Sequence, residues 1–188
     1  MKTILYIILI FAMTISASTQ AKMQSKNNKI LIVYFSHSGN TRIVAEKIKN
    51  ATGGAIFEII PTIAYPTDYN TVVDQAKKEI SKGYKPELKS KINNIEQYDI
   101  IFVGSPNWWS TFAPPVATFL SSYNFNGKTI VPFITHEGSE MGHSVADIKK
   151  LCPKANVLNG LAIKGTKVNN SDTEISKWLK ENKINTKK

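Results

Sequence analysis

The chain has 188 residues, of which 42% are hydrophobic and 20% are charged. This composition excludes a disordered or collagen-like protein and predicts a single globular domain. The formal net charge is +10, and it comes almost entirely from lysine because Arg42 is the only arginine. The single cysteine, Cys152, excludes an internal disulfide framework and a zinc site built from several thiolates, so we interpret it as a small apolar core residue.

The first 21 residues have the pattern of a secretory signal peptide. Lys2 precedes an apolar run over residues 4–15, and small and polar residues follow as far as Ala21. A helix that crosses a bilayer needs about 20 apolar residues, so this run is short for a permanent span. We predict a cleaved signal peptide (1–21), a flexible leader (22–28), and an exported, periplasmic or extracytoplasmic protein without a stable membrane span. The alternative is an uncleaved N-terminal anchor.

Strand and helix patterns alternate five times along the rest of the chain. A continuous apolar run over residues 30–35, typical of a parallel strand that is buried on both faces, predicts the first strand, and mostly apolar segments predict further strands over 55–60, 99–104, 129–135 and 157–163. Helices are predicted after each run: from about Ile43 to a stop at Gly53-Gly54, over 70–82, from Pro114 onward, over 144–151 and over 173–181. This order predicts an α/β domain over residues 29–184, with a five-stranded parallel sheet between two layers of helices.

The loops after the first, third and fourth strands are the candidate site, because ligands bind beyond the carboxyl ends of the strands in such sheets. The first loop, just before a helix, contains Ser36, Ser38, Gly39, Asn40 and Thr41. Free N–H groups at a helix N-terminus bind anions, and a glycine lets the backbone approach a ligand closely. We predict a phosphate site here. The alternative is an ordinary N-cap formed by Ser38 or Asn40.

The second loop, residues 105–112, contains Pro106, Asn107 and the adjacent residues Trp108 and Trp109. Loops mostly run over the surface, and an exposed indole beside a phosphate site suits stacking on a flat aromatic ligand. We expect one of the two tryptophans to pack under the loop as local core instead.

The third loop combines polar side chains with glycines in Thr135, His136, Glu137, Gly138 and Ser139, and its backbone amides suit the polar edge of a ring system. His136 is a candidate general acid or base, and an imidazole that holds the loop by a hydrogen bond is an equally good interpretation. The other two histidines, His37 and His143, are interpreted as solvated surface residues. The spacing of the three histidines does not indicate a metal site.

Together these loops resemble those of the flavodoxin family. The sequence Ser36-x-Ser38-Gly39-Asn40-Thr41 after the first strand resembles the loop that binds the FMN phosphate in flavodoxins. The loop over 106–109 resembles the one that contacts one side of the isoalloxazine ring. Residues 127–139 resemble the fourth strand and third flavin loop of a short flavodoxin-like subfamily, and Tyr65-Pro66-x-x-Tyr69 also fits that subfamily.

The resemblance implies a flavodoxin-like three-layer sandwich with strand order 2-1-3-4-5 and non-covalently bound FMN. By this resemblance, Ser36, Ser38, Gly39, Asn40 and Thr41 would bind the FMN phosphate. Residues 106–109 would contact the isoalloxazine ring, and residues 135–139 would form the remaining wall of the FMN site. Redox chemistry would belong to the flavin, while the protein would tune its potential by stacking, hydrogen bonds and charge. A Glu137 carboxylate near the ring would disfavour the anionic reduced form.

Three functions follow as hypotheses. The first is an FMN-binding carrier that passes electrons between partners, and the second is an FMN-dependent NAD(P)H:quinone-type oxidoreductase in which His136 donates a proton. The third is a binding module without flavin that uses the Trp108-Trp109 surface. The redox partner, a protein or a small quinone-like acceptor, is not identified by the sequence.

Cytoplasmic flavodoxins are typically acidic, so the positive charge of this chain is a departure from them. Lysines that solvate the helices explain it most simply, and a lone arginine argues against nucleic-acid binding.

Overall fold

The computed structural model describes residues 28–187, so the predicted signal peptide and nearly all of the predicted leader lie outside the described residues. Its centre is a parallel sheet in the order β2-β1-β3-β5-β6. The strands are β1 (Ile30–Tyr34), β2 (Ala55–Glu58), β3 (Ile100–Trp108), β5 (Thr129–His136), β6 (Asn156–Val157) and β7 (Leu161–Lys164). Both β6 and β7 pair with β5 in parallel. This arrangement confirms the predicted order 2-1-3-4-5, with the fifth strand divided in two.

The division of the last strand differs from the single run predicted over residues 157–163. The polar Asn159 and the following Gly160 interrupt the run between β6 and β7. The Asn159 carbonyl accepts hydrogen bonds from Trp178 Nε1 at 2.9 Å and from Asn182 Nδ2 at 3.3 Å. The interruption between β6 and β7 is therefore bonded to the end of α5.

The segment predicted as the second loop is also more regular than expected. Strand β3 continues to Trp108 and pairs antiparallel with the short strand β4 (Thr111–Phe112), which makes a hairpin. Trp109 and Ser110 form its two-residue tip with φ values of 51° and 65°. Two positive φ values in a two-residue turn correspond to type I′, whose twist matches that of the flanking strands.

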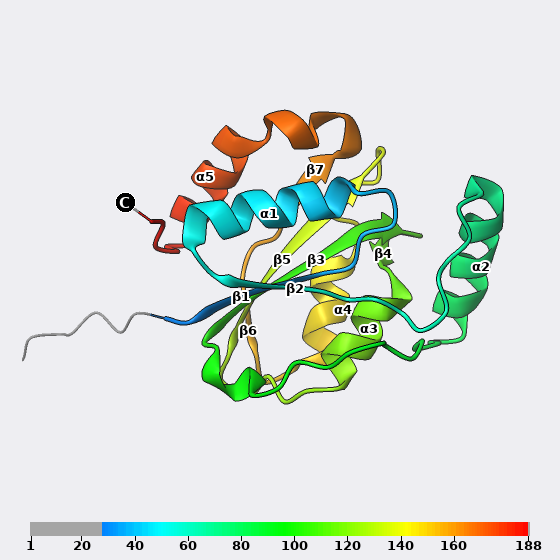
Figure 1. The fold of residues 1–188 in the computed structure, drawn as a ribbon, viewed down its shortest axis with the longest axis horizontal. Coiled ribbons are helices and arrows are strands. Elements are labelled where there is room, and N and C mark those ends of the chain that lie inside the picture. Colours follow the sequence, from blue (N-terminus) through cyan, green and yellow to red (C-terminus); the bar gives the residue numbers. More distant parts are fainter. Residues whose placement is uncertain (1–27, 188) are drawn as a thin grey trace, which may run out of the picture.

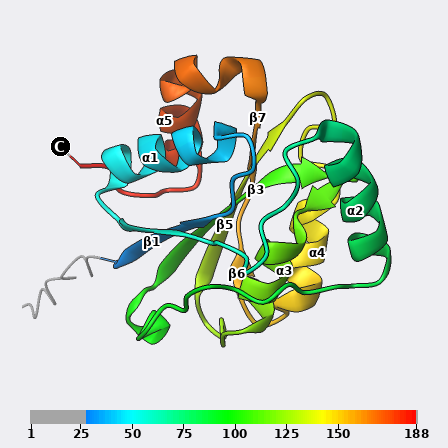
Figure 2. The ribbon, with the colours of Figure 1, turned by 45° about the vertical axis from the view of Figure 1, so that its right-hand side comes forward.

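Helices cover both faces of the sheet (Figures 1 and 2). Helices α1 (Asn40–Thr52) and α5 (Asp172–Glu181) lie on one face, and α3 (Pro114–Ser121) and α4 (Ser144–Leu151) lie on the other. Helix α2 (Tyr69–Ser81) stands at one end of the molecule in Figure 1, and two short 3-10 helices occupy Ile95–Gln97 and Gly165–Asn170. None of the helices in the described range is both long and apolar enough to cross a membrane.

Side chains that alternate along β1 enter two separate cores. Leu31 and Val33 pack with the apolar face of α3, including Val116. Ile32 packs on the opposite side, with residues of α1 and α5 such as Val44. A strand that is buried on both faces in this way needs a continuous apolar run, which is the pattern that predicted it.

The two ends of the sheet are distinct surfaces. At the carboxyl edge, β1, β3 and β5 end and are followed by residues 35–41, the β3–β4 hairpin and residues 136–143. At the amino edge the same strands begin, and α1, α3, α4 and α5 end there because the helices run antiparallel to the strands. The candidate site lies at the carboxyl edge.

Candidate functional site

The start of α1 is open to a ligand. Gly39 is the N-cap with φ 94°, and no side chain caps the helix from that position. The alternative of a Ser38 or Asn40 cap is therefore not what the structure shows. Ser36 Oγ accepts a hydrogen bond of 3.3 Å from the amide of Arg42, further into the first turn. A Cβ added to Gly39 would meet no atom within 4 Å, so the space above the helix N-terminus is free.

The three predicted loops contact one another at the carboxyl edge. The buried hydroxyls of Thr41 and Thr135 lie 2.8 Å apart and join the first loop to the third. Asn107 Nδ2 donates to the carbonyl of Glu140 at 2.8 Å, which joins the hairpin to the third loop. A second tie runs from the His143 amide to the Ser110 carbonyl, also at 2.8 Å. The predicted site residues are therefore brought together from three separate segments.

The two tryptophans have different environments, as expected. Trp108 is half-buried, and its ring packs edge-on against Phe35, Tyr65 and His37 at centroid distances of 5.6, 4.9 and 5.8 Å. Trp109 is 46% exposed. Trp108 is thus the one that packs as local core, where it fixes the first loop against the hairpin. Trp109 is the one whose ring remains available to a ligand.

Helix α2 holds the exposed tryptophan in place. Trp109 Nε1 donates to the carbonyl of Val73 at 3.0 Å, and Lys77 Nζ lies 4.7 Å from the centroid of the indole ring. A positive φ is costly for a residue with a Cβ, on the order of 1–2 kcal/mol. The contacts with α2 offset that cost, and they orient the ring at the rim of the site.

The third loop carries an unpaired buried nitrogen. His136, the last residue of β5, has its Nδ1 buried without a hydrogen-bond partner among the described residues. Nδ1 therefore does not hold the loop by a hydrogen bond, which leaves this atom free for a ligand. Gly138 and Ser139 are exposed, and a Cβ on Gly138 would meet open space.

The side chains of Glu137 and Asn40 both contact Gly165, a residue that the sequence did not indicate as part of the site. A Cβ built on Gly165 would lie 2.1 Å from Glu137 Oε1 and 2.6 Å from Asn40 Nδ2. Both polar groups therefore pack directly on the Gly165 backbone, beside the start of α1. A negative charge at this place is close to the predicted phosphate position as well as to the third loop.

A cluster around Asp147 was also missed, because its members are far apart in the sequence. The Asp147 carboxylate accepts from Thr111 Oγ1 at 2.9 Å and pairs with His143 at 2.5 Å and Lys150 at 2.9 Å. Burial alone would raise the pKa of Asp147, but hydrogen bonds from Lys150, Thr111 and His143 outweigh it and hold the pKa below its usual value. The cluster fastens the third loop and β4 to α4.

His37 also differs from its interpretation as a solvated residue. Its Nε2 lies 2.8 Å from the Pro66 carbonyl, and its ring packs on Trp108. It therefore connects the first loop to the segment before α2. His143 is exposed as expected, although its Nδ1 lies 2.5 Å from an Asp147 carboxylate oxygen.

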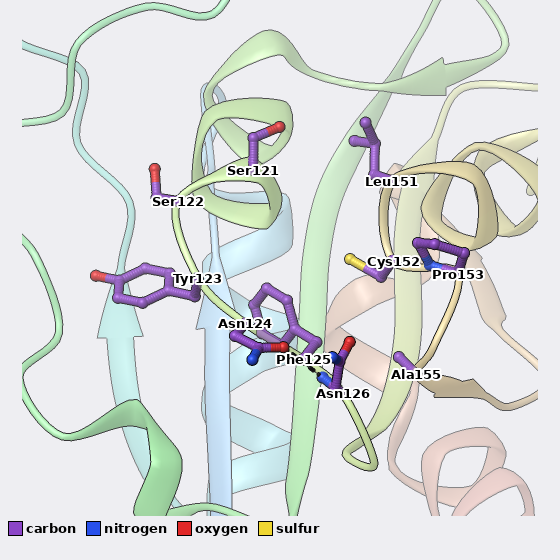
Figure 3. A pocket seen from close by; sticks show the side chains of 10 residues that line it. All are labelled: Ser121, Ser122, Tyr123, Asn124, Phe125, Asn126, Leu151, Cys152, Pro153 and Ala155. Atoms are coloured by element: carbon purple, nitrogen blue, oxygen red, sulfur yellow. Dashed lines mark hydrogen bonds between the residues drawn. The ribbon is translucent and has the colours of Figure 1, made fainter.

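Two surface cavities lined by described residues lie at the amino edge, far from the three loops. The first, of about 370 Å³, is lined by the ends of α3 and α4, including Ser122, Phe125 and Cys152 (Figure 3). The Cys152 side chain is buried and its Sγ lies 3.9 Å from the Leu120 carbonyl. Burial raises the pKa of the Cys152 thiol to about 11.

We expect Cys152 to be chemically inert in the folded protein. Only the thiolate is a strong nucleophile, and at neutral pH a pKa near 11 leaves on the order of 100-fold less thiolate than an ordinary cysteine has. Titration with a disulfide reagent such as DTNB should show very slow labelling in native buffer and rapid labelling in denaturant. Stoichiometric labelling of the native protein within minutes would show that the thiol is accessible and ionised.

Comparison with known proteins places the chain in a family. The family model for flavodoxin matches residues 29–182, and the chain belongs to the flavodoxin family. A candidate flavoprotein from Bacteroides eggerthii is 34% identical, with a TM-score of 0.74, and the match covers 82% of this chain and 97% of that one. A second, from Bacteroides uniformis, is 29% identical with a TM-score of 0.73, covering 81% and 98%.

A flavoprotein from Lactobacillus acidophilus, solved in complex with FMN, is 27% identical with a TM-score of 0.64. That match covers 76% of this chain and 97% of the other. The comparison with curated proteins returned no match.

Proposed function

We propose that this chain binds FMN at the carboxyl edge and carries electrons between partner molecules. The observation that carries the proposal is the convergence of three loops at the start of α1, where the N-cap residue Gly39 faces open space. Membership of the flavodoxin family and the similarity to the Lactobacillus acidophilus protein in complex with FMN support the choice of ligand.

The residues present fit the parts of this cofactor. The open N-terminus of α1, with Ser36 and Ser38 beside it, provides donors for the phosphate. Trp109 offers an exposed aromatic face for the ring, and the unpaired His136 Nδ1 offers a polar contact at the opposite loop. When bound, FMN would supply the one- or two-electron redox chemistry of the proposed carrier.

The alternative function is that of an NAD(P)H:quinone-type oxidoreductase. Unlike an electron carrier, such an enzyme needs a binding site for a small substrate and a residue that donates a proton to it. His136 is the only described histidine with an unpaired buried nitrogen, so it is the residue that this alternative would use. A reductive titration of the FMN-loaded full chain separates the two functions. For a carrier we expect two resolved one-electron steps and negligible quinone reduction by NADPH. Rapid quinone turnover that is lost in His136→Gln would favour the enzyme.

Glu137→Gln is expected to raise the reduction potential of bound flavin. The Glu137 carboxylate lies at the start of the third loop and opposes negative charge that develops on reduction. Because Glu137 is exposed, solvent screens the interaction, and the expected rise is on the order of 30 mV for one electron. Glu140→Gln, in the same loop, is the control and should shift the potential less. Equal potentials in wild type and Glu137→Gln would refute this role.

We also propose that residues 1–21 are a signal peptide and that the mature protein is exported. The charged residue, short apolar run and small residues before Ala21 support this proposal. N-terminal sequencing of the protein recovered from a bacterial periplasmic fraction should begin near residue 22. Recovery of the intact N-terminus in the cytoplasm would contradict export.

A further inference from the structure

We propose that the amino edge is a docking surface for an anionic phospholipid membrane and that it holds the carboxyl edge away from the bilayer. Exposed lysines gather there from several segments that are distant in the sequence. They are Lys29, Lys49, Lys91, Lys149, Lys154, Lys180, Lys183 and Lys187. The acidic residues of the same edge are fewer: Glu96, Asp99 and Glu181.

The opposite edge is close to neutral. Acidic residues at and beside the carboxyl ends of the strands are Glu58, Asp68, Glu137, Glu140, Asp147, Asp172 and Glu174. The basic residues there are Arg42, Lys47, Lys77, Lys150, Lys164 and Lys167, and three of them pair with counted acidic residues: Arg42 with Glu58, Lys47 with Asp172 and Lys150 with Asp147. The net positive charge is therefore not spread evenly as a solvating layer but is concentrated at the amino edge. An anionic surface would orient the molecule with that edge toward it.

Helix stability does not account for all of these lysines. Lys49, Lys149 and Lys180 lie in the last turns of their helices, where a positive charge complements the helix dipole. Lys29 and Lys154 lie outside any helix and make no ion pair with another described residue. The charge at this edge thus exceeds what the helix ends use.

The amino edge also has a concave part that suits a lipid headgroup. A hollow of about 880 Å³ lies between the ends of α1 and α5. Lys180, Lys183 and Lys187 line it together with the polar Asn50 and Ser176. Several lysines around one hollow can neutralise a phosphate more effectively than lysines on a flat surface, because their charges converge on it.

The N-terminal part of the chain joins the fold at the same edge. Strand β1 begins at Ile30, on the same side of the molecule as the C-terminal end in Figure 1. Cleavage after Ala21, as proposed above, leaves two further lysines, Lys22 and Lys26, in the sequence before β1. Any membrane contact made by this segment presents the amino edge to the bilayer. The single arginine of the chain argues against a nucleic acid as the occupant, and a protein that exchanges electrons would dock at the carboxyl edge, where the candidate site lies. An anionic bilayer is therefore the occupant that the amino edge fits.

Vesicle binding by the full chain tests the proposal. Co-sedimentation with vesicles of phosphatidylglycerol and phosphatidylcholine should exceed that with phosphatidylcholine alone, and added salt should weaken it. The double variant Lys154→Gln/Lys183→Gln removes one exposed lysine from each side of the amino edge. At about 1 kcal/mol per lysine near an anionic surface, binding should weaken by about 30-fold.

The control variant is Lys164→Gln/Lys167→Gln, which removes the same charge from exposed positions near the carboxyl edge. It should weaken vesicle binding by less than about threefold, because these lysines lie far from the docked surface. Equal losses in the two variants, or equal binding to both kinds of vesicle, would overturn the proposal. It would also be overturned if the wild type bound an RNA oligomer more tightly than anionic vesicles. Thermal unfolding of each variant verifies that the fold is retained.

Discussion

Ser38→Asp is expected to weaken FMN binding by about 30- to 100-fold without destabilising the protein. Ser38 is exposed in the loop just before the open start of α1. A carboxylate there repels a nearby phosphate by about 2–3 kcal/mol at the effective dielectric constant of a protein surface. The same charge is favourable toward the helix N-terminus by a few tenths of a kcal/mol, so the free energy of unfolding should stay equal or increase.

Two comparisons isolate the phosphate. Ser38→Asn removes the hydroxyl without adding charge and should weaken FMN binding much less. Riboflavin lacks the phosphate, so its affinity should be the same for wild type and Ser38→Asp. Isothermal titration calorimetry with both ligands measures these differences. Equal losses of FMN and riboflavin affinity would show that the first loop does not bind the phosphate.

Trp108→Ala is expected to destabilise the protein by about 2–4 kcal/mol, whereas Trp109→Ala should cost less than about 1 kcal/mol. Trp108 makes edge-on contacts with Phe35, Tyr65 and His37, so its loss leaves a hole between the first loop and the hairpin. Trp109 is largely exposed, and its removal takes away one hydrogen bond and the contact with Lys77. Chemical denaturation of the two variants measures the difference.

The same pair of variants should respond differently to FMN. Trp109→Ala keeps the fold but loses an aromatic face, and we expect FMN affinity to fall by about tenfold from the loss of one stacking contact. A conservative Trp109→Phe change should restore much of that affinity. If Trp109→Ala were as destabilising as Trp108→Ala, the division between a core and a ligand-facing tryptophan would be wrong.

The sheet was predictable because each of its central strands has its own local signal. The segments over 30–35, 99–104 and 129–135 are mostly apolar on both faces, and their short length and content of Ile, Val and Phe favour a buried strand over a buried helix. The split of the last strand was not predictable from hydrophobicity. The Asn159 carbonyl at the interruption bonds to Trp178, a contact formed only when α5 packs on the sheet.

The location of the candidate site was predictable for a topological reason. Loops that follow neighbouring parallel strands must lie at one edge, and the hydrogen bonds that join Thr41 to Thr135 and Asn107 to Glu140 confirm that the three loops meet there. The supporting contacts of Asp147, His37 and Gly165 were not predictable. Each depends on partners far away in the sequence, and no local pattern marks them.

The structure shows where the positive charge lies, which the composition could not show. From the sequence alone, lysines that solvate the helices were the simplest explanation. In the structure the excess of lysine lies at the amino edge, whereas acidic and basic side chains nearly balance at the carboxyl edge. A protein with this polarity can be oriented by an anionic surface while its cofactor edge remains open to a partner.

The central claim is that the three loops at the carboxyl edge bind FMN. Titration of the purified full chain into FMN, followed by flavin fluorescence and the visible spectrum, tests it most directly. We predict saturable one-to-one binding with quenched fluorescence, as stacking on Trp109 requires, and much weaker binding in Ser38→Asp. A folded wild-type protein that leaves the fluorescence and spectrum of FMN unchanged would contradict the claim.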